Sequence, residues 1–282
     1  MRRLIINADD FGLTSGVNQA IIELHRARAL TSATLMATGA AFAQAVSSAM
    51  QATTLGVGGH VVLVDGTPVL PASQIPSLVA ENEQKTPQFR AKLSAFVADL
   101  LRGRIADSEI EAEATAQIRK LQQAGIRVTH VDTHKHTHMF PRVLRPLLRA
   151  ALACGVKAIR NPFEPNWSLN ATANAGHVRK MQMRLLRSQS TSFAQEVTRV
   201  GLKTTDGAIG VLATGTLDAQ TIRNLLSAMP NGTWELVCHP GYNDAALQQQ
   251  RTRLLDAREV ERTALLETIP GADVERIHFG EL

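Results

Sequence analysis

The chain has 282 residues, of which 44% are apolar and 20% are charged. These proportions are those of a globular protein with a substantial core, and they exclude intrinsic disorder. No run approaches the roughly 18 uninterrupted apolar residues of a membrane span, and the N-terminal residues show no signal-peptide pattern. Two cysteines, Cys154 and Cys238, are too few for a disulfide framework. We therefore expect a cytoplasmic protein.

The net charge is +5, a balance that is compatible with nucleic acid or an anionic membrane surface as a partner. Aromatic residues make up only 4% of the chain, with a single tyrosine, so there is no stacking platform for single-stranded nucleic acid. No helix-turn-helix, zinc-finger or RNA-recognition pattern is present. We therefore expect no nucleic-acid partner.

In the first half of the chain, short apolar runs alternate with segments of helical periodicity. Ser15 is expected to cap the first helix, the sequence Ser108-Glu-Ile-Glu111 to form a capping box, and Gly155 to end a later helix. Strands are predicted at Leu4–Ile6, Ala33–Ala37, Leu55–His60 and Val128–Asp132, and helices at 17–24, from about 41, at 110–121 and at 141–154.

The alternation continues to the end of the chain. Further strands are predicted at Val156–Arg160, Ala208–Leu212, Trp234–His239 and Val274–Phe279, with a helix around 222–229. Strands that alternate with helices indicate an α/β protein with a parallel sheet. Eight such units in this length predict one domain, 1–282, folded as a TIM-like (βα) barrel of seven or eight mostly parallel strands, with irregular closure allowed. Two long loops, 64–87 and 162–176, follow strands and are expected over the catalytic face.

Polar residues end five of the predicted strands. Because the carboxyl ends of barrel strands converge on one pocket, these residues are the candidates for chemistry. They are Asn7–Gly12, Gly58–His60, His130–His138, Arg160 and Cys238–Gly241.

One carboxylate and two neutral imidazoles form a common ligand set for a catalytic divalent ion. Asp10, His60 and a histidine of the 130–138 run could supply it. Neighbouring residues on a strand face opposite ways. Asp9 could therefore act as a base beside Asp10 only if the strand ends there, as Gly12 suggests. The alternatives are a turn and helix cap for the two aspartates, a core position for His60, and a surface cluster for the histidine run.

The late histidine, His239, precedes Pro-Gly and therefore sits at a strand-to-turn junction, where a proton donor would be useful; the alternative is a loop-capping role. Its neighbour Cys238 is not favoured as a nucleophile, because adjacent strand residues diverge. Asp132 is interpreted as a partner that orients a ligand histidine rather than as a ligand itself. His136 and His138 either support the site in the same way or face solvent.

These motifs resemble the YdjC-like (ChbG) carbohydrate deacetylase family. The resemblance rests on four ordered motifs spread over nearly the whole chain: Asn7-Ala-Asp-Asp-Phe-Gly12, Gly59-His60, His130-Val-Asp-Thr-His-Lys-His-Thr-His-Met-Phe-Pro141 and Cys238-His-Pro-Gly-Tyr242. It implies a βα-barrel-like fold and removal of acetyl groups from N-acetylglucosamine units of small saccharides such as chitooligosaccharides. It also implies a divalent metal, usually magnesium, with zinc as the alternative.

The resemblance assigns roles residue by residue. The family's metal ligands fall on Asp10, His60 and His134, where the HxDxHxH pattern favours His134 over His136. The base matches Asp9, and the late histidine His239 is assigned as the general acid. Departures from the family pattern at Gly59, Lys135 and Thr137 leave this metal site intact but do not fix the exact substrate.

Two further residues are expected to contact substrate. Arg160 could help to stabilise the oxyanion, and Trp167 could stack on a pyranose ring, although Trp167 could equally anchor its own loop. The rival interpretations are another metal enzyme with the same ligands, such as a phosphoesterase or an Fe(II) oxygenase, and a non-catalytic barrel that binds a saccharide or lipid. Homodimerisation is compatible with the fold.

The chain also resembles a hopanoid-associated branch of this family, which is implied to act on a lipid-linked N-acetylglucosamine. The similarity lies in Leu55–Gly58, Val62–Leu70 and Arg160–Pro165. The segment His177–Val200 mixes basic and apolar residues in the manner of a helix that rests on an anionic membrane surface. The alternative is a solvated helix on the outside of the barrel.

Overall fold

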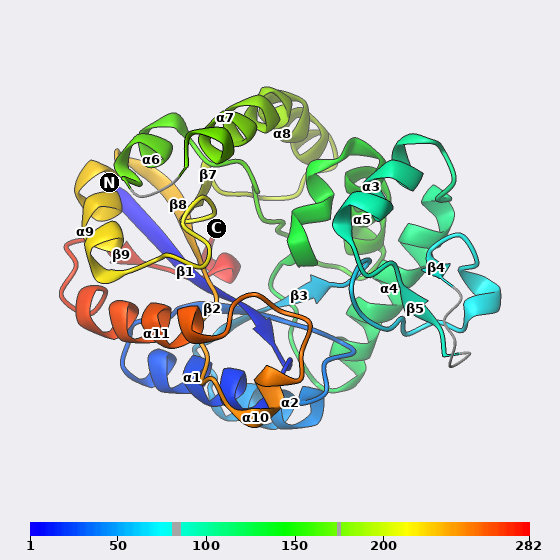
Figure 1. The fold of residues 1–282 in the computed structure, drawn as a ribbon, viewed down its shortest axis with the longest axis horizontal. Helices are drawn as coiled ribbons and strands as arrows, with labels where there is room; N and C mark the ends of the chain where they lie inside the picture. Colours follow the sequence, from blue (N-terminus) through cyan, green and yellow to red (C-terminus); the bar gives the residue numbers. More distant parts are fainter. Residues whose placement is uncertain (81–85, 174–175) are drawn as a thin grey trace.

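The computed structural model describes residues 1–80, 86–173 and 176–282, and its centre is a curved, mostly parallel sheet (Figure 1). In the described chain, the ladder runs in the order β6-β3-β2-β1-β8-β7, while β9 pairs with the start of β1. The strands are β1 Arg2–Phe11, β2 Ser32–Leu35, β3 Gly56–Val61, β6 Val131–Thr133, β7 Gly207–Ile209, β8 Gly232–Cys238 and β9 Glu275–Arg276. A separate antiparallel pair is formed by β4, Val79–Ala80, and β5, Gln88–Phe89.

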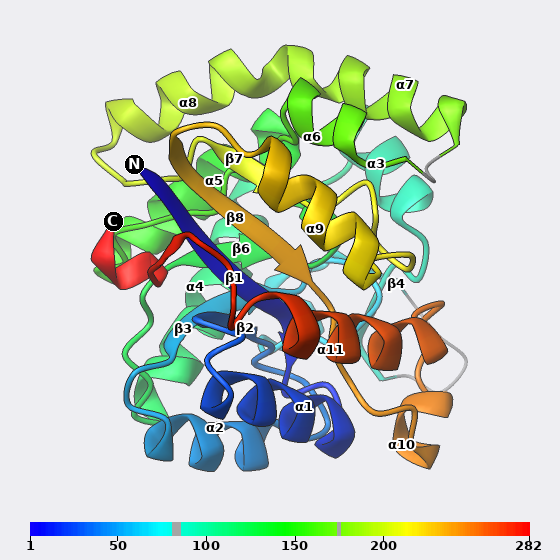
Figure 2. The ribbon, with the colours of Figure 1, turned by 90° about the vertical axis from the view of Figure 1, so that its left-hand side faces the viewer.

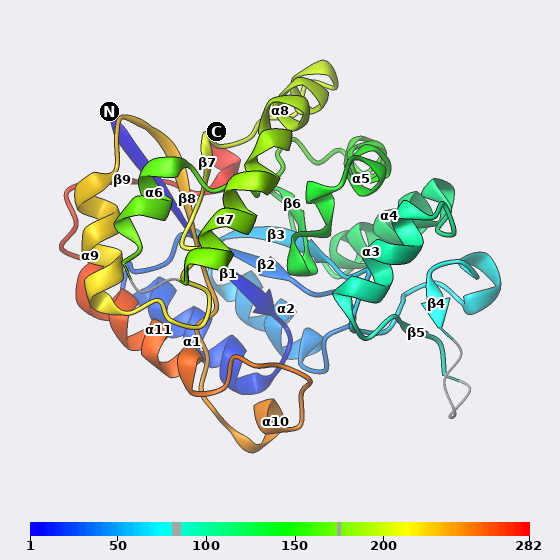
Figure 3. The ribbon, with the colours of Figure 1, turned by 45° about the horizontal axis from the view of Figure 1, so that its top comes forward.

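The predicted strand Val156–Arg160 is not a ladder strand. It makes single parallel bridges, Ile159 to Val131 on one side and Ala158 to Lys203 on the other. Pro162, two residues after Arg160, has no N–H with which to continue the pairing. The sheet therefore curls as in a barrel but is joined on this side by isolated bridges, so the predicted TIM-like barrel is observed only in part (Figure 3).

Helices surround the curled sheet (Figures 1 and 2). They are α1 Ser15–Arg26, α2 Phe42–Gln51, α3 Leu93–Leu101, α4 Asp107–Gln123, α5 Pro141–Ala153, α6 Asn166–Ala171, α7 His177–Leu186, α8 Ser190–Arg199, α9 Ala219–Ala228, α10 Ala245–Gln248 and α11 Asp256–Thr268. Short 3₁₀ turns occur at Ala72–Gln74, His134–Met139, Arg187–Gln189 and Phe279–Glu281. Across the described residues, no helix combines the length and the hydropathy needed to cross a membrane.

Two of the predicted helix caps are wrong. The N-cap of α1 is Thr14, whose side chain accepts a hydrogen bond from the Val17 amide, so Ser15 is already the first helical residue. The helix α4 begins at Asp107, which places Ser108 inside the first turn, where it cannot cap. Gly155 ends α5 as predicted, in the left-handed region at φ 71°.

The apolar core is formed largely by one cluster of buried side chains that runs from Leu4 to Ile269 in the sequence. It holds Leu4, Ile6 and Ala8 on one face of β1, whereas Ile5 on the other face packs in a smaller cluster with Ala158, Ile277 and Phe279. The strand is buried from Leu4 to Phe11. The carboxyl ends of β1, β3 and β8 and the residues just after β6 meet at one side of the sheet. Asp9, Asp10, His134 and His239 from these ends line a common cavity, and the buried His60 lies against Asp10 and His134.

Candidate active site

The end of β1 brings two neighbouring carboxylates to the same side. The pairing of β1 with β2 shifts register between Ala8 and Phe11, and Asp10 lies in the left-handed region at φ 65°. Asp and Asn tolerate this conformation better than other non-glycine residues. Asp9 and Asp10 therefore both line the cavity, which a regular strand would not allow.

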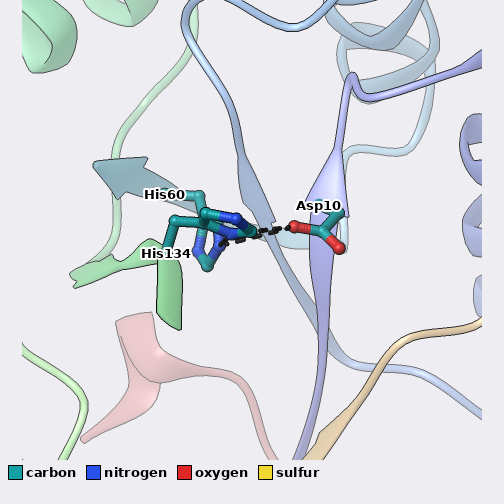
Figure 4. Close-up of side chains that lie close together, drawn as sticks. All are labelled: Asp10, His60 and His134. Atoms are coloured by element: carbon teal, nitrogen blue, oxygen red, sulfur yellow. Dashed lines mark hydrogen bonds and ion pairs between the residues drawn. The ribbon is translucent and has the colours of Figure 1, made fainter. Parts of the chain in front are cut away.

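Asp10 meets two histidines in the arrangement of a metal site (Figure 4). Its Oδ1 lies 3.6 Å from His60 Nε2 and 3.4 Å from His134 Nδ1, and these two ring nitrogens lie 3.3 Å apart. This oxygen is buried and has no hydrogen-bond donor among the described residues. One carboxylate oxygen and two imidazole nitrogens that converge in this way fit a divalent cation.

His60 is oriented by a second carboxylate from the neighbouring strand. Its Nδ1 lies 2.7 Å from Asp132 Oδ1, so the Nδ1 proton is donated there and Nε2 is directed at Asp10 and His134. Burial alone would lower the pKa of His60, but Asp132, Asp9 and Asp10 outweigh it and raise this pKa to about 9. The geometry is that of a carboxylate–histidine pair of the kind that orients metal ligands.

Arg160 lies beneath the site and is completely buried. Its guanidinium donates to Asp9 at 2.9 and 2.6 Å and to Glu235 at 2.8 Å, and it also pairs with Asp132. Asp9, His60 and Asp132 form a second group with metal-like spacing, but Arg160 is already the cation there. Arg160 does not line the cavity, so the structure does not place it where sequence analysis expected a substrate contact.

This ion pair controls the ionisation of Asp9. Burial would raise the pKa of the Asp9 carboxyl, but the charge and hydrogen bonds of Arg160 outweigh it and hold this pKa well below its ordinary value. Asp9 also accepts hydrogen bonds from Asn7 at 3.1 Å and Thr34 at 3.2 Å, both through Oδ1. Asp9 is therefore an ionised carboxylate in a fixed orientation.

Sequence analysis did not identify Arg258, which lines the cavity from α11. Its Nη2 donates to Asp10 Oδ2 at 2.6 Å, and its other groups donate to the carbonyls of Leu254, at 3.0 Å, and His239, at 3.4 Å. A Cβ atom on Gly241 would lie 3.0 Å from Arg258 Cδ, so the glycine of the Cys238–Tyr242 motif leaves room for this side chain.

His239 follows β8 and lines the cavity beside Asp9. Its Nε2 lies 3.8 Å from Asp9 Oδ2, and its amide donates to Glu261 Oε2 at 2.6 Å, which fixes the backbone at this point. His136 also lines the cavity, and burial together with the nearby charge of Arg160 lowers its pKa to about 3. His138 is fully buried instead and bonds to Thr133 at 2.7 Å.

The cavity has a volume of about 1100 Å³, which accommodates a small saccharide. The described part of the loop 64–87 contributes Asp65, Gly66 and Thr67 to its wall, and Asp65 pairs with Lys135 at 2.7 Å. Residues 88–89, 91–94 and 249–254 form other parts of the wall. The described residues of the loop 162–176 contain α6 and do not line the cavity.

Trp167 lies on α6 and packs edge-on against Trp234, with 5.1 Å between the ring centroids. It is absent from the cavity wall and is half-buried against the apolar core. Of the two interpretations that the sequence left open, this placement favours an anchor for its own loop over a sugar-stacking platform.

Glu235, like Arg258, was missed by sequence analysis. It interrupts the apolar strand Trp-Glu-Leu-Val-Cys, and a charged residue in the middle of a buried strand is a signal that could have identified it. Arg258 carries a weaker signal, because α11 is rich in both acidic and basic residues and resembles a solvated helix.

Comparison with known proteins supports the family resemblance that the four motifs indicate. A family model described as YdjC-like protein matches residues 3–274. A carbohydrate deacetylase of Brevibacillus brevis is 40% identical over 149 residues, 53% of this chain and 55% of that protein, so the chain spans about half the length of this relative. A chitooligosaccharide deacetylase of Salmonella paratyphi C is 30% identical over 250 residues, 88% of this chain and 85% of that protein.

The solved structures agree with the fold. A crystal structure from Enterococcus faecalis V583, provisionally described as a cellobiose-phosphate cleavage protein, is 26% identical and superposes with a TM-score of 0.77 over 99% of this chain and 98% of that one. A lactam utilization protein of Thermus thermophilus, at 16% identity and a TM-score of 0.53 over 98% and 99% of the two chains, shares the fold alone. From its fold, its four ordered motifs and the match over residues 3–274, we conclude that the chain belongs to the YdjC-like protein family.

Proposed function

We propose that this chain is a metal-dependent deacetylase that hydrolyses the N-acetyl group of a saccharide containing N-acetylglucosamine. The observation that carries the proposal is the convergence of Asp10, His60 and His134 at the wall of the cavity, which Asp9, Asp10, His134 and His239 line. The names of the Salmonella and Brevibacillus relatives support the reaction class.

Asp10, His60 and His134 would hold the metal. A divalent ion bound there supplies a Lewis acid that polarises the acetyl carbonyl and lowers the pKa of a bound water. The family resemblance suggests magnesium, whereas two imidazole nitrogens in a ligand set of three favour zinc or another transition ion. Reconstitution of the metal-free protein with each ion, followed by the rate of acetate release, decides between them.

Asp9 is proposed to accept the proton of the attacking water. Its Oδ2 accepts a hydrogen bond from Arg160 Nη1 at 2.9 Å and also faces His239, while its Oδ1 accepts hydrogen bonds from Asn7, Thr34 and Arg160 Nη2. We assign Arg160 to keeping Asp9 ionised and oriented, in place of the direct oxyanion contact suggested by sequence.

His239 is proposed to deliver a proton to the departing sugar amine. It lines the cavity, and the bond from its amide to Glu261 fixes the backbone from which the ring extends. Asp9 and His239 lie side by side, so the ionised carboxylate and the proton donor face the same part of the cavity.

The test is acetate release by the metal-reconstituted protein, measured on diacetylchitobiose and on an N-acetylglucosaminyl lipid. Asp9→Asn and His239→Ala should each retain the metal and lose about 10²–10⁴-fold in turnover. His25→Ala, which removes a histidine of α1 that lies outside the cavity wall, is the matched control and should leave the rate unchanged. Full activity of Asp9→Asn would remove the base assignment. Phosphate release from a phosphoester, with no acetate from either saccharide, would favour the phosphoesterase interpretation.

A further inference from the structure

The net charge of the chain is concentrated in one segment. Residues 177–200 carry five lysines and arginines and one carboxylate, Glu196, so they account for four of the chain's five net positive charges. Glu196 is itself paired with Arg145 and Arg199. The rest of the chain is therefore nearly neutral, and the basic character is a local property of α7 and α8.

The same segment exposes apolar side chains. Val178, Met181 and Leu185 are 67%, 67% and 74% exposed, and their i, i+3 and i+7 spacing places them on one face of α7. We call these three residues the α7 stripe. Met183 lies on the opposite face and packs against the core, so the stripe is the outer face of a docked helix.

Basic side chains lie next to the stripe. Arg184 and Arg187 are exposed, and neither pairs with a carboxylate among the described residues; Arg184 only reaches the amide oxygen of Asn170, at 3.2 Å. Together, α7 and α8 form one edge of the molecule, where neither is covered by another described element (Figure 2).

The α7 stripe is also close to the cavity. Arg179, one residue after Val178, lines the cavity and donates to the carbonyl of Val211 at 3.3 Å. A surface that binds α7 would therefore lie beside the cavity wall.

We propose that the α7 stripe and its flanking arginines dock the protein on an anionic lipid surface. Apolar side chains on the exposed face would enter the boundary between headgroups and acyl chains, while the cations contact lipid phosphates, as in helices that lie in a membrane interface. Because Arg179 of the same helix lines the cavity, the cavity wall would then lie beside the lipid surface. The docking itself is independent of the proposed deacetylation, whereas a lipid-linked saccharide as substrate rests on it.

The first experiment is co-sedimentation of the full chain with phosphatidylcholine vesicles that contain about 30% phosphatidylglycerol. Binding is expected to these vesicles, with at least about tenfold weaker binding to phosphatidylcholine alone. It should also weaken when NaCl rises from about 50 to about 500 mM, because salt screens the arginines. Equal binding to both vesicle types, or no binding at low salt, overturns the proposal.

Two sets of variants separate the contribution of the α7 stripe to vesicle binding from that of the flanking arginines. The triple variant Val178→Ser, Met181→Ser, Leu185→Ser should bind at least about 10²-fold more weakly, because it removes the apolar contribution. Arg184→Gln with Arg187→Gln should weaken binding about tenfold. The matched control is the triple variant Met50→Ser, Leu101→Ser, Val260→Ser, which removes apolar side chains that are 60%, 73% and 49% exposed on other helices. If the stripe variant binds as tightly as the parent or the control, the proposal is wrong.

Two further measurements distinguish lipid docking from an effect on catalysis and from dimerisation. Acetate release from soluble diacetylchitobiose should be the same in the stripe variant as in the parent, because none of the three side chains lines the cavity. Absence of acetate from every variant would contradict the proposed function and leave the vesicle result standing on its own. Sedimentation velocity tests whether the α7 stripe instead binds a second copy of the chain. If the parent is a dimer and the stripe variant is a monomer, the stripe is a dimer interface, and lipid docking is overturned.

Discussion

Arg258 donates to Asp10 across 248 positions of sequence, at 2.6 Å between Nη2 and Oδ2. The bond occupies one oxygen of the carboxylate and leaves the other, Oδ1, directed at His60 and His134. The helix α11 thereby determines which oxygen the metal would receive. It also ties the metal ligand to the loop that carries His239, through the Arg258 bond to the His239 carbonyl.

Arg258→Met should reduce turnover, because it preserves most of the buried volume but frees Asp10 to rotate. Loss of a partner that orients a metal ligand typically costs about 10–100-fold in metal affinity or activity. Metal affinity by titration calorimetry and acetate release by the reconstituted protein measure the two contributions. Arg262→Met is the control, since Arg262 lies on the same helix but pairs with Glu23 outside the cavity wall. Unchanged affinity and rate in Arg258→Met would show that Asp10 needs no such support.

Asp10→Asn should abolish stoichiometric metal binding, because the amide removes the negative charge of the ligand. Asparagine tolerates the left-handed backbone at φ 65°, so this variant tests the ligand without adding backbone strain. Asp65→Asn is a close control: Asp65 also lines the cavity and also lies in the left-handed region, at φ 57°. Metal content of the purified proteins by mass spectrometry should fall only in Asp10→Asn. Equal loss in both would point to a general effect of cavity charge.

Glu235 should give the folding stability a distinctive dependence on pH. Burial raises the pKa of this carboxyl from 4.5 to about 7, against the opposing charge of Arg160. Between about pH 4.5 and 7 the folded chain holds a proton at Glu235 that the unfolded chain has lost, so the free energy of unfolding falls as pH rises through this window.

Glu235→Gln removes this titration and serves as the reference. The difference in the free energy of unfolding between parent and variant should decrease by about 3 kcal/mol across the window, and should be flat below it. Urea denaturation at a series of pH values measures this difference. A constant difference from pH 4.5 to 7 would show that Glu235 has an ordinary pKa in the folded state.

Trp167→Ala should lower stability without changing substrate affinity. The side chain packs on Trp234 and lies outside the cavity wall, so its loss removes core contacts only. Truncation of a packed tryptophan costs on the order of 3 kcal/mol. Thermal unfolding should show this loss while KM for diacetylchitobiose stays at the parent value. A raised KM at unchanged stability would restore the sugar-stacking interpretation.

The strand ends were predictable because apolar runs and the polar residues that follow them are local features. The motif around Asp9 and Asp10, the His60 position and the histidine run all lie next to predicted strands. The structure brings Asp10, His60 and His134 together, and Asp9, Asp10, His134 and His136 line one cavity. Even the condition for two inward aspartates, an early end to the regular strand, could be stated from Gly12. In the structure β1 continues to Phe11, and a register shift after Ala8 with a left-handed Asp10, in place of a strand end, turns both carboxylates to one side.

What could not be predicted depends on contacts between distant segments. Arg160 ends a predicted strand and looked available to substrate, but three carboxylates from other strands surround its guanidinium. Arg258 lies in a helix whose composition resembles a solvated surface, and only its position above Asp10 reveals its contact. The missing ladder at 156–160 has a similar cause, since single bridges to Val131 and Lys203 depend on the curvature of the whole sheet.

The place of β1 in the sheet has a consequence for how the chain is made. Residues Arg2–Ala8 pair along their whole length with β8, which lies about 230 residues later, and Arg3–Leu4 pair with β9. During synthesis, the strand that bears Asp9 and Asp10 can pair early with β2, but its other edge must wait for nearly the entire chain before it gains β8. Such non-local pairing slows folding, and we expect nascent chains stalled before Gly232 to be unable to bind the metal, however long they are held on the ribosome.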